Sequence, residues 1–341
     1  MSFRRTLPLA ALAIVAAAFA RTGVPKPDVI SLPDGDAGIG FDDLQYAASV
    51  PAILAPGGRT GFLVLIDPRT KALSPVEGFS SEAKFSGGHG QGTTSAVEGD
   101  GLVFASDRGS KVIKAVDPKA KKIVSSAPLS GTPDYVRFVA RRHEIWVTEP
   151  GKKQVEILRV DPDTHAMQGV GKVAFPDGPE SLVIDGERGR AYTHSWQGET
   201  YAVDVEARKV VATWKNGCEG SRGAAIDIER GMLFVGCAEG RQAVIDVTSG
   251  RLIGSAQAGS DVDSIAYNPV LRHLYVPGGG SADLSILAVS GDGDLSLLGK
   301  VPTGPDAHTA AIDPATNDVY VGSPEHGQVL VLRDPFPASA R

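Results

Sequence analysis

Four titratable residues recur at one position of a repeating segment. Each of them stands five residues before an Asp or Asn that ends a short apolar run. The four residues are Glu180, Arg222, Asp263 and His308, and the run ends are Asp185, Asp227, Asn268 and Asp313. Because only 22% of the chain is Asp, Glu, Lys or Arg, random placement is unlikely to produce this recurrence. The pattern predicts that acids, a guanidinium and an imidazole gather at one site.

Further titratable residues precede the corresponding runs elsewhere in the chain. They are Asp42, Asp43, His89, Asp134, Arg137, Glu219, Asp261 and Asp306. His89 stands in the glycine-rich segment 87–92, which has neither the lysine nor the following helix that phosphate-binding loops use. We therefore interpret this segment as a flexible loop that carries His89 over the site.

Carboxylates that converge repel one another unless a cation, a proton or an arginine compensates them. One hypothesis supplies a divalent metal ion as a cofactor. Its ligands would be Asp43, Asp134, Glu180 and Asp263, together with His89 or His308. Oxygen ligands with one imidazole suit Ca²⁺, Mg²⁺, Mn²⁺ or Zn²⁺, and the sequence does not choose among them.

A second hypothesis uses arginine as the compensating charge. Arg137 and Arg222 would neutralise the acids in an alternating belt that recognises a small polar ligand, such as a carboxylate or a sugar. The ligand-binding residues would then be His89, Asp134, Arg137, Glu180, Arg222, Asp263 and His308. A solvated ring of charges without any ligand is the third possibility.

The elements that must position these residues form a long repeat. Seven short apolar strands, which we interpret as the second strand of each repeat, begin at Ile53, Val103, Ile145, Ala191, Leu233, Leu274 and Val319. Their starts are separated by 50, 42, 46, 42, 41 and 45 residues. Each second strand is followed by a third strand, and most third strands by a fourth. Units of this period predict an all-β, seven-bladed β-propeller with four-stranded antiparallel blades. The first strand of each blade would line the central channel, with the preceding loops open on one face.

The end of the chain predicts how the ring closes. The seventh blade lacks a fourth strand, because residues 335–341 are rich in Pro and Ala. Val29–Leu32 is a spare apolar strand near the N-terminus. An unpaired sheet edge favours aggregation, and we therefore expect Val29–Leu32 to pair beside Val329–Leu332.

Several of the repeated segments resemble a known family. Val319–Gly322 (VYVG) and Leu274–Pro277 (LYVP) look like the YVTN repeat of the YncE-like seven-bladed propellers of bacterial envelopes, as does the turn Ile312–Thr316. The resemblance extends from about Asp42 to Asp334, although blades 1 and 2 lack the aromatic-Val-Thr core of the motif. It implies an exported binding or scaffold protein.

The alternative function is that of a metal-dependent hydrolase, because gluconolactonase-like propellers hydrolyse lactones at such channel mouths. Asp134 or Glu180 would hold the metal while His89 or His308 moves the proton. The sequence contains no H-E-x-x-H, G-x-S-x-G or haem C-x-x-C-H motif, and we therefore place binding ahead of catalysis.

The chain has two cysteines, Cys218 and Cys237, both expected near the channel-mouth face. In an exported protein two thiols usually pair. A straight hairpin would place Cys237 opposite Arg222, so a bridge requires the intervening loop to fold back within the Cα separation that a disulfide allows. A disulfide, free buried thiols and metal ligation therefore all remain open, with the disulfide favoured.

The N-terminus predicts export. Arg4 and Arg5 precede the apolar run 7–19 and the cleavage pattern Ala18–Ala20, so residues 1–20 are expected to be a signal peptide and 21–341 one domain. Cleavage removes two arginines and leaves 32 basic against 40 acidic residues, a net charge of −8. This charge argues against nucleic acid and anionic membranes as partners. We expect a periplasmic or extracellular monomer, with a small polar ligand or an envelope protein as its partner.

Overall fold

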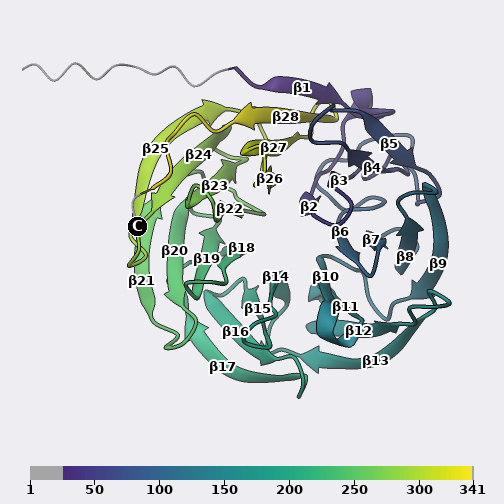
Figure 1. The fold of residues 1–341 in the computed structure, drawn as a ribbon, viewed down its shortest axis with the longest axis horizontal. Coiled ribbons are helices and arrows are strands. Elements are labelled where there is room, and N and C mark those ends of the chain that lie inside the picture. Colours follow the sequence, from purple (N-terminus) through teal and green to yellow (C-terminus); the bar gives the residue numbers. More distant parts are fainter. Residues whose placement is uncertain (1–25, 340–341) are drawn as a thin grey trace, which may run out of the picture.

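The computed structural model describes residues 26–339, which form a ring of seven four-stranded antiparallel sheets (Figure 1). In chain order, blades 1 to 3 contain β2 (Gln45–Ala47), β3 (Ala52–Pro56), β4 (Leu63–Ile66), β5 (Leu73–Val76), β6 (Ala96–Gly99), β7 (Leu102–Asp107), β8 (Val112–Asp117), β9 (Lys122–Pro128), β10 (Val136–Val139), β11 (Glu144–Glu149), β12 (Gln154–Val160) and β13 (Met167–Ala174). Blades 4 to 6 contain β14 (Pro179–Asp185), β15 (Arg190–Ser195), β16 (Glu199–Asp204), β17 (Lys209–Lys215), β18 (Ser221–Asp227), β19 (Met232–Cys237), β20 (Arg241–Asp246), β21 (Leu252–Gln257), β22 (Ala266–Asn268), β23 (His273–Gly278), β24 (Asp283–Val289) and β25 (Leu295–Pro302). The predicted all-β propeller is confirmed.

Blade 7 combines the two ends of the chain. It contains β26 (Ala310–Asp313), β27 (Asp318–Ser323), β28 (Gln328–Arg333) and β1 (Asp28–Ser31). β1 pairs antiparallel to β28, with Val29 opposite Leu330 and Ile30 opposite Val329. The predicted closure by an N-terminal strand is confirmed, and Figure 1 shows β1 on the outer edge of the ring. The other regular elements are the short 3₁₀ helices η1 (Gly35–Ala37), η2 (Ala140–Arg142) and η3 (Pro150–Lys152).

The hydrophobic core is divided into seven clusters, each of which lies between two neighbouring blades. The second strands supply most of the large side chains, including Phe104, Trp146, Tyr275 and Tyr320, which are all fully buried. Both faces of a second strand contact an adjacent blade, which explains why these strands are continuously apolar rather than alternating. Truncating one of these aromatic residues to Ala is expected to cost roughly 3–5 kcal/mol.

β-Bulges interrupt the innermost strands of blades 4 and 5. The pairing of β14 with β15 shifts between Glu180 and Val183, and that of β18 with β19 shifts between Ser221 and Ala224. Bulges bend a strand and re-aim its side chains. In both blades the shift lies at the mouth end of the strand, where Glu180 and Arg222 stand.

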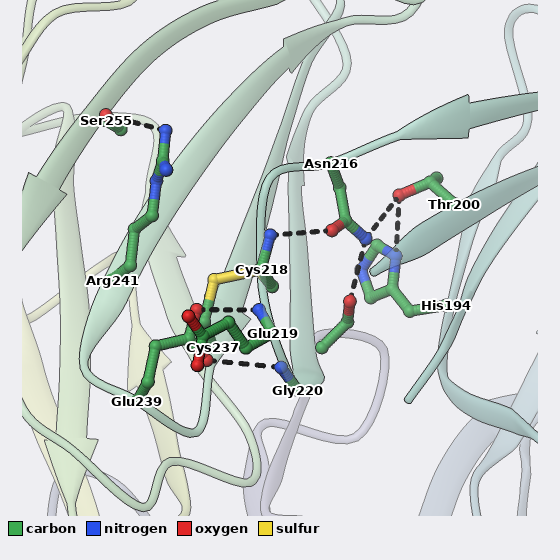
Figure 2. The surroundings of a disulfide bond; sticks show 11 residues. His194, Thr200, Asn216, Cys218, Glu219, Gly220, Cys237, Glu239, Arg241 and Ser255 are labelled. Atoms are coloured by element: carbon green, nitrogen blue, oxygen red, sulfur yellow. Dashed lines mark hydrogen bonds between the residues drawn. A yellow bond between two sulfur atoms is a disulfide. The ribbon is translucent and has the colours of Figure 1, made fainter. Parts of the chain in front are cut away.

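A disulfide joins Cys218 to Cys237 at the mouth end of blade 5, with a Cα–Cα separation of 5.4 Å (Figure 2). The bulge places Ser221, rather than Arg222, opposite Cys237. The loop folds back because the Ala238 N–H donates to the Gly220 carbonyl, and the Glu239 carboxylate accepts from the N–H groups of Glu219 and Gly220. The favoured disulfide is confirmed.

The predicted signal peptide, residues 1–20, lies outside the described residues. Within residues 26–339, no helix combines the length and the apolar character that crossing a bilayer requires.

Candidate functional site

The strand register defines one equivalent position in all seven blades. In each blade we take the last residue of the first strand that is paired with a residue of the second strand. In chain order these residues are Ala47, Gly99, Val139, Asp185, Asp227, Asn268 and Asp313. Counting back five residues reaches Asp42, Thr94, Asp134, Glu180, Arg222, Asp263 and His308, which we call the mouth ring. The pattern that the sequence showed in blades 4 to 7 therefore extends around the whole propeller, with Thr94 as its one residue that does not titrate.

A cavity of about 630 Å³ opens at this end of the channel. Its lining includes six of the seven residues predicted to bind a ligand: His89, Asp134, Glu180, Arg222, Asp263 and His308. Arg108 and Trp196 also line it, each from the loop between the second and third strands of its blade. The structure thus brings together titratable residues from distant parts of the chain.

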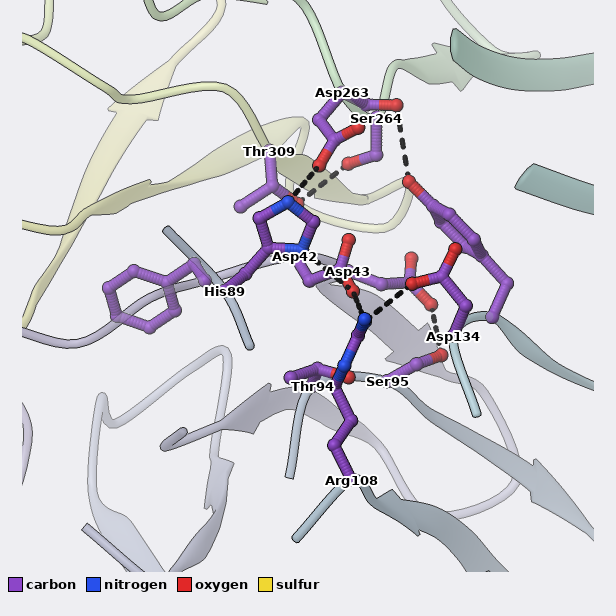
Figure 3. Close-up of polar contacts among 12 residues, drawn as sticks. Asp42, Asp43, His89, Thr94, Ser95, Arg108, Asp134, Asp263, Ser264 and Thr309 are labelled. Atoms are coloured by element: carbon purple, nitrogen blue, oxygen red, sulfur yellow. Dashed lines mark hydrogen bonds and ion pairs between the residues drawn. The ribbon is translucent and has the colours of Figure 1, made fainter. Parts of the chain in front are cut away.

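Blades 1 to 3 contribute a compact charged group (Figure 3). The Arg108 guanidinium donates to Asp134 at 2.6 Å and to Asp42 at 3.4 Å. His89 Nδ1 lies 3.3 Å from the same Asp42 oxygen, and its Nε2 lies 3.6 Å from Asp263 across the mouth. The His89 imidazole therefore lies between the carboxylates of Asp42 in blade 1 and Asp263 in blade 6.

Asp263 and His308 form the opposite side of the cavity. His308 Nε2 donates to the Phe41 carbonyl at 2.8 Å, which ties blade 7 to the chain entering blade 1. The backbone carbonyl of Asp263 accepts from the hydroxyl of Tyr135 in blade 3, at 3.2 Å. This hydrogen bond connects blade 3 to blade 6 across the channel.

Glu180, Trp196 and Arg222 form the remaining side. The indole N–H of Trp196 donates to the Glu180 carboxylate. The Arg222 guanidinium lies over the Trp196 ring, 5.2 Å from its centroid, in a cation–π contact. Trp196 is nevertheless 43% exposed, so that part of its surface faces solvent at the mouth.

Asp43 and Arg137 lie one level below the cavity rather than in its lining. Arg137 binds both carboxylate oxygens of Asp43, at 2.6 and 3.2 Å. Asp43 also accepts from Ser95 at 2.6 Å and from Gln45 at 2.8 Å. Both residues were predicted for the site, but the structure places them in a closed ion pair within the channel wall.

The residues that follow the mouth ring form a second layer, which we call the wall ring: Asp43, Ser95, Tyr135, Ser181, Gly223, Ser264 and Thr309. Its hydroxyl groups connect neighbouring blades. Ser95 accepts the Val136 N–H at 3.0 Å, and Thr309 accepts the Leu44 N–H at 3.2 Å. These contacts hold the first strands at fixed separations and thereby position the mouth ring above them.

His89 and Asp42 behave as a charged pair. The Asp42 carboxylate raises the pKa of His89 to about 10, against the opposing effect of burial. Burial by itself raises the pKa of Asp42, but His89 and Arg108 outweigh it and hold that pKa below its usual range.

The other three carboxyl groups of the mouth ring show the opposite behaviour. Burial and the charge of Asp42 raise the pKa of Asp134 to about 7, although Arg108 opposes the shift. Burial, Asp134 and Asp263 raise the pKa of Glu180 well above its ordinary value. Burial and Asp42 likewise raise the pKa of Asp263. These three groups therefore retain protons more readily than free carboxyl groups do.

A possible metal site consists of Asp42, His89 and Asp134, whose donor atoms lie within 4.8 Å of one another. Arg108 donates to both carboxylates of this group. Arg108 is a permanent cation and already supplies the positive charge that a metal ion would bring. While Arg108 occupies this position, the donor atoms of Asp42, His89 and Asp134 fit a metal ion poorly. Asp43, the predicted ligand from blade 1, is instead engaged by Arg137.

Asp42 and Arg108, which form the charged group with His89 and Asp134, were absent from the predicted ligand sets. Asp42 precedes a first strand that ends in Ala47 rather than Asp or Asn, so the marker that identified blades 4 to 7 is missing there. Arg108 lies in a loop between second and third strands, and propeller topology places such loops on the mouth face too. Inspecting those loops for unpaired charges would have identified it.

No protein-family model and no curated protein sequence matches the chain. Several solved structures share its fold. A chain of the mitotic checkpoint complex superposes with a TM-score of 0.76 at 11% identity, over 98% of both chains. The Myceliophteria thermophila Cps50 (Swd1) β-propeller domain gives 0.71 at 11% identity, over 90% of this chain and 99% of that one. Kuenenia stuttgartiensis hydrazine synthase gives 0.70 at 12%, over 88% and 96%. At these identities the similarity concerns the fold alone, and by that fold the chain is a seven-bladed β-propeller.

Proposed function

We propose that this chain is an exported binding or scaffold propeller of the YVTN type, and that it binds a small polar ligand in the mouth cavity. The aromatic tetrads that resemble YVTN, such as Leu274–Pro277, lie in the buried second strands and account for the fold. Ligand recognition falls to the loops above them, which supply the lining of the cavity.

The observation that carries this proposal is a pair of buried carboxylate oxygens without hydrogen bonds. Among the described residues, Asp42 Oδ1 and Asp263 Oδ2 have no hydrogen-bond partner, although Asp42 is only 1% and Asp263 only 9% exposed. Leaving such atoms unsatisfied is costly, and native proteins seldom do so without a functional reason. Asp263 lines the cavity, where a ligand could donate to it.

The proposal is tested by a thermal-shift screen with small sugars, carboxylates and amines. We expect at least one class to raise the melting temperature of the wild type, and the effect to be lost in Asp263→Asn. Glu229→Gln removes an exposed acid in the turn between β18 and β19, on the opposite face, and serves as the matched control. If no compound shifts the wild type, or if the Asp263→Asn variant responds equally, the mouth is not a binding site.

Export is tested separately with the full chain. We expect it to be found outside the cytoplasm with its N-terminus near Arg21, because residues 1–20 carry the pattern of a signal peptide. Retention of an uncleaved chain in the cytoplasm would contradict this part of the proposal.

A metal-dependent, lactonase-like hydrolase is the second candidate, and the clustering of Asp42, His89 and Asp134 is what favours it. The residues would hold a metal ion only if Arg108 moved away from their carboxylates. Elemental analysis of protein purified without chelators decides between the candidates. A stoichiometric divalent metal, lost together with lactone hydrolysis on EDTA treatment, would place the hydrolase first.

A further inference from the structure

We infer that the ligand of the mouth cavity is an organic cation whose protonated amino group binds between Glu180 and Asp263. This inference rests on the proposed function and specifies the class of ligand. It is drawn from the balance of charge in the cavity, from the hydrogen bonds that its carboxyl groups lack, and from the apolar surface at its rim.

The lining of the cavity contains more acids than permanent cations. Its five carboxyl side chains are Asp134, Glu180, Asp261, Asp263 and Asp306, and its two guanidinium groups are Arg108 and Arg222. Both His89 and His308 also line it, but His89 is held by Asp42, an acid behind the lining. Because burial raises the pKa of Asp134, Glu180 and Asp263, a cation bound among them would favour their ionised forms, whereas an anionic ligand would oppose ionisation.

The two arginines are already engaged away from Glu180. Arg108 binds Asp134 and Asp42, and Arg222 lies over the Trp196 ring. Within residues 26–339, Glu180 forms no ion pair, and its one cavity-side partner is the Trp196 N–H. Glu180 is thus a buried carboxyl group with an acceptor position left for a ligand.

Asp263 offers the second acceptor. Its Oδ2 makes no hydrogen bond to any residue that the structure describes, and the nearest imidazole nitrogens lie 3.6 Å away on His89 and 3.9 Å away on His308. An ammonium group brings three N–H donors and a full positive charge. It would therefore supply the missing hydrogen bond and favour the ionised forms of both carboxyl groups, whereas the hydroxyl groups of a sugar would supply only hydrogen bonds.

The rim accommodates the rest of such a ligand. Trp196, Phe85, Pro150 and Pro324 all line the cavity and provide apolar surface beside the acids. The exposed ring of Trp196 suits contact with a cation or with a flat apolar group. A compound with an amino group at one end and an apolar body at the other matches this division of the site.

The test measures binding of the intact mature chain by isothermal titration calorimetry, with probes that differ in one group. 2-Phenylethylamine is compared with 2-phenylethanol, cadaverine with pentane-1,5-diol, and glutarate serves as the anionic probe. We expect each amine to bind at least tenfold more tightly than its alcohol, and glutarate not to bind. Glu180→Gln and Asp263→Asn, which preserve side-chain shape, should each weaken amine binding about tenfold, while Glu229→Gln should leave it unchanged.

Proton release provides a second readout that a nonspecific contact would not produce. An ammonium ion beside Glu180 and Asp263 favours their ionised forms, as well as that of neighbouring Asp134. Binding at pH 7 should therefore release protons, seen as heats that differ between buffers of unequal ionisation enthalpy. Glu180→Gln should reduce this release.

The outcomes separate this inference from the function on which it rests. Tighter binding of an alcohol or of glutarate, or amine binding that Glu180→Gln and Asp263→Asn leave intact, would overturn the amine assignment while leaving a ligand site in place. Failure of every probe here and of every compound in the thermal-shift screen would overturn both.

Discussion

The mouth ring and the wall ring occupy adjacent positions at the entrance of each first strand, yet they differ in how their polar groups are satisfied. In the wall ring, Asp43 accepts four hydrogen bonds from Arg137, Ser95 and Gln45. In the mouth ring, Asp42 and Asp263 each retain a buried oxygen without a hydrogen bond to any residue in 26–339. Buried polar groups with all their hydrogen bonds formed contribute to the stability of a fold, whereas buried polar groups without partners can accept hydrogen bonds from a ligand. From this difference we expect the wall ring to contribute to stability and the mouth ring to be available for the proposed ligand.

The largest expected effect comes from breaking the ion pair of the wall ring. Arg137→Ala leaves the Asp43 carboxylate buried without its cation, and we expect it to lower the free energy of unfolding by about 3–5 kcal/mol. The measurement is urea denaturation at pH 7. Arg222→Ala is the matched mouth variant and should cost about 0.5–1 kcal/mol, since it removes one partly exposed cation–π contact. Equal losses in the two variants would remove the distinction between the rings.

Removing the disulfide should have the next largest effect. The Cys218–Cys237 bridge has a sequence separation of 19 residues, and its loss by Cys218→Ser with Cys237→Ser should cost about 3 kcal/mol. The bridge holds the loop that precedes Arg222. We therefore also expect the amide hydrogens of this loop to exchange faster in the double variant than in the wild type. Unchanged exchange there would show that hydrogen bonds to Glu239 hold the loop without help from the bridge.

Most of the fold could be predicted because every blade repeats the same pattern of apolar strands and polar turns. A continuously apolar second strand, bounded by Asp, Asn, Gly and Pro turns, must be buried between neighbouring blades, and seven such strands require a ring. The closure by β1 followed from the missing fourth strand after Arg333. These features depend on local patterns of residues, which a sequence displays directly.

The site residues could be predicted only in blades whose first strand ends in Asp or Asn, because that residue marks the position five residues earlier. First strands that end in Asp185, Asp227, Asn268 and Asp313 identified the mouth positions of blades 4 to 7. Blade 1 ends its first strand in Ala47, and the choice between Asp42 and Asp43 depends on which side chain turns upward. The reach of Arg108 to Asp134, 26 residues along the chain, depends on how two loops pack and not on any repeated spacing.

The hydroxyl groups of the wall ring offer a smaller perturbation. Thr309→Val keeps the shape of the side chain but leaves the buried Leu44 N–H without its acceptor, and we expect a loss of about 1–3 kcal/mol. Thr132→Val changes an exposed threonine of the mouth in the same way and should be nearly neutral. Urea denaturation of both variants gives the comparison. A costly Thr132→Val would mean that the mouth also contributes to blade packing.

The smallest effect concerns a mouth acid and depends on pH. Burial, Asp134 and Asp263 raise the folded-state pKa of Glu180 above the unfolded value near 4.3. At pH 3, well below both pKa values, both states hold the proton, and the unfolding free energy of Glu180→Gln should equal that of the wild type. As the pH rises, the unfolded chain releases this proton while the folded chain keeps it, so the wild type loses stability that the glutamine variant retains. We expect the variant to be more stable than the wild type at pH 6, with Glu229→Gln unchanged at both pH values. A Glu180→Gln variant that is less stable at both would show that Glu180 supports the fold as Asp43 does, and would end the contrast between mouth and wall.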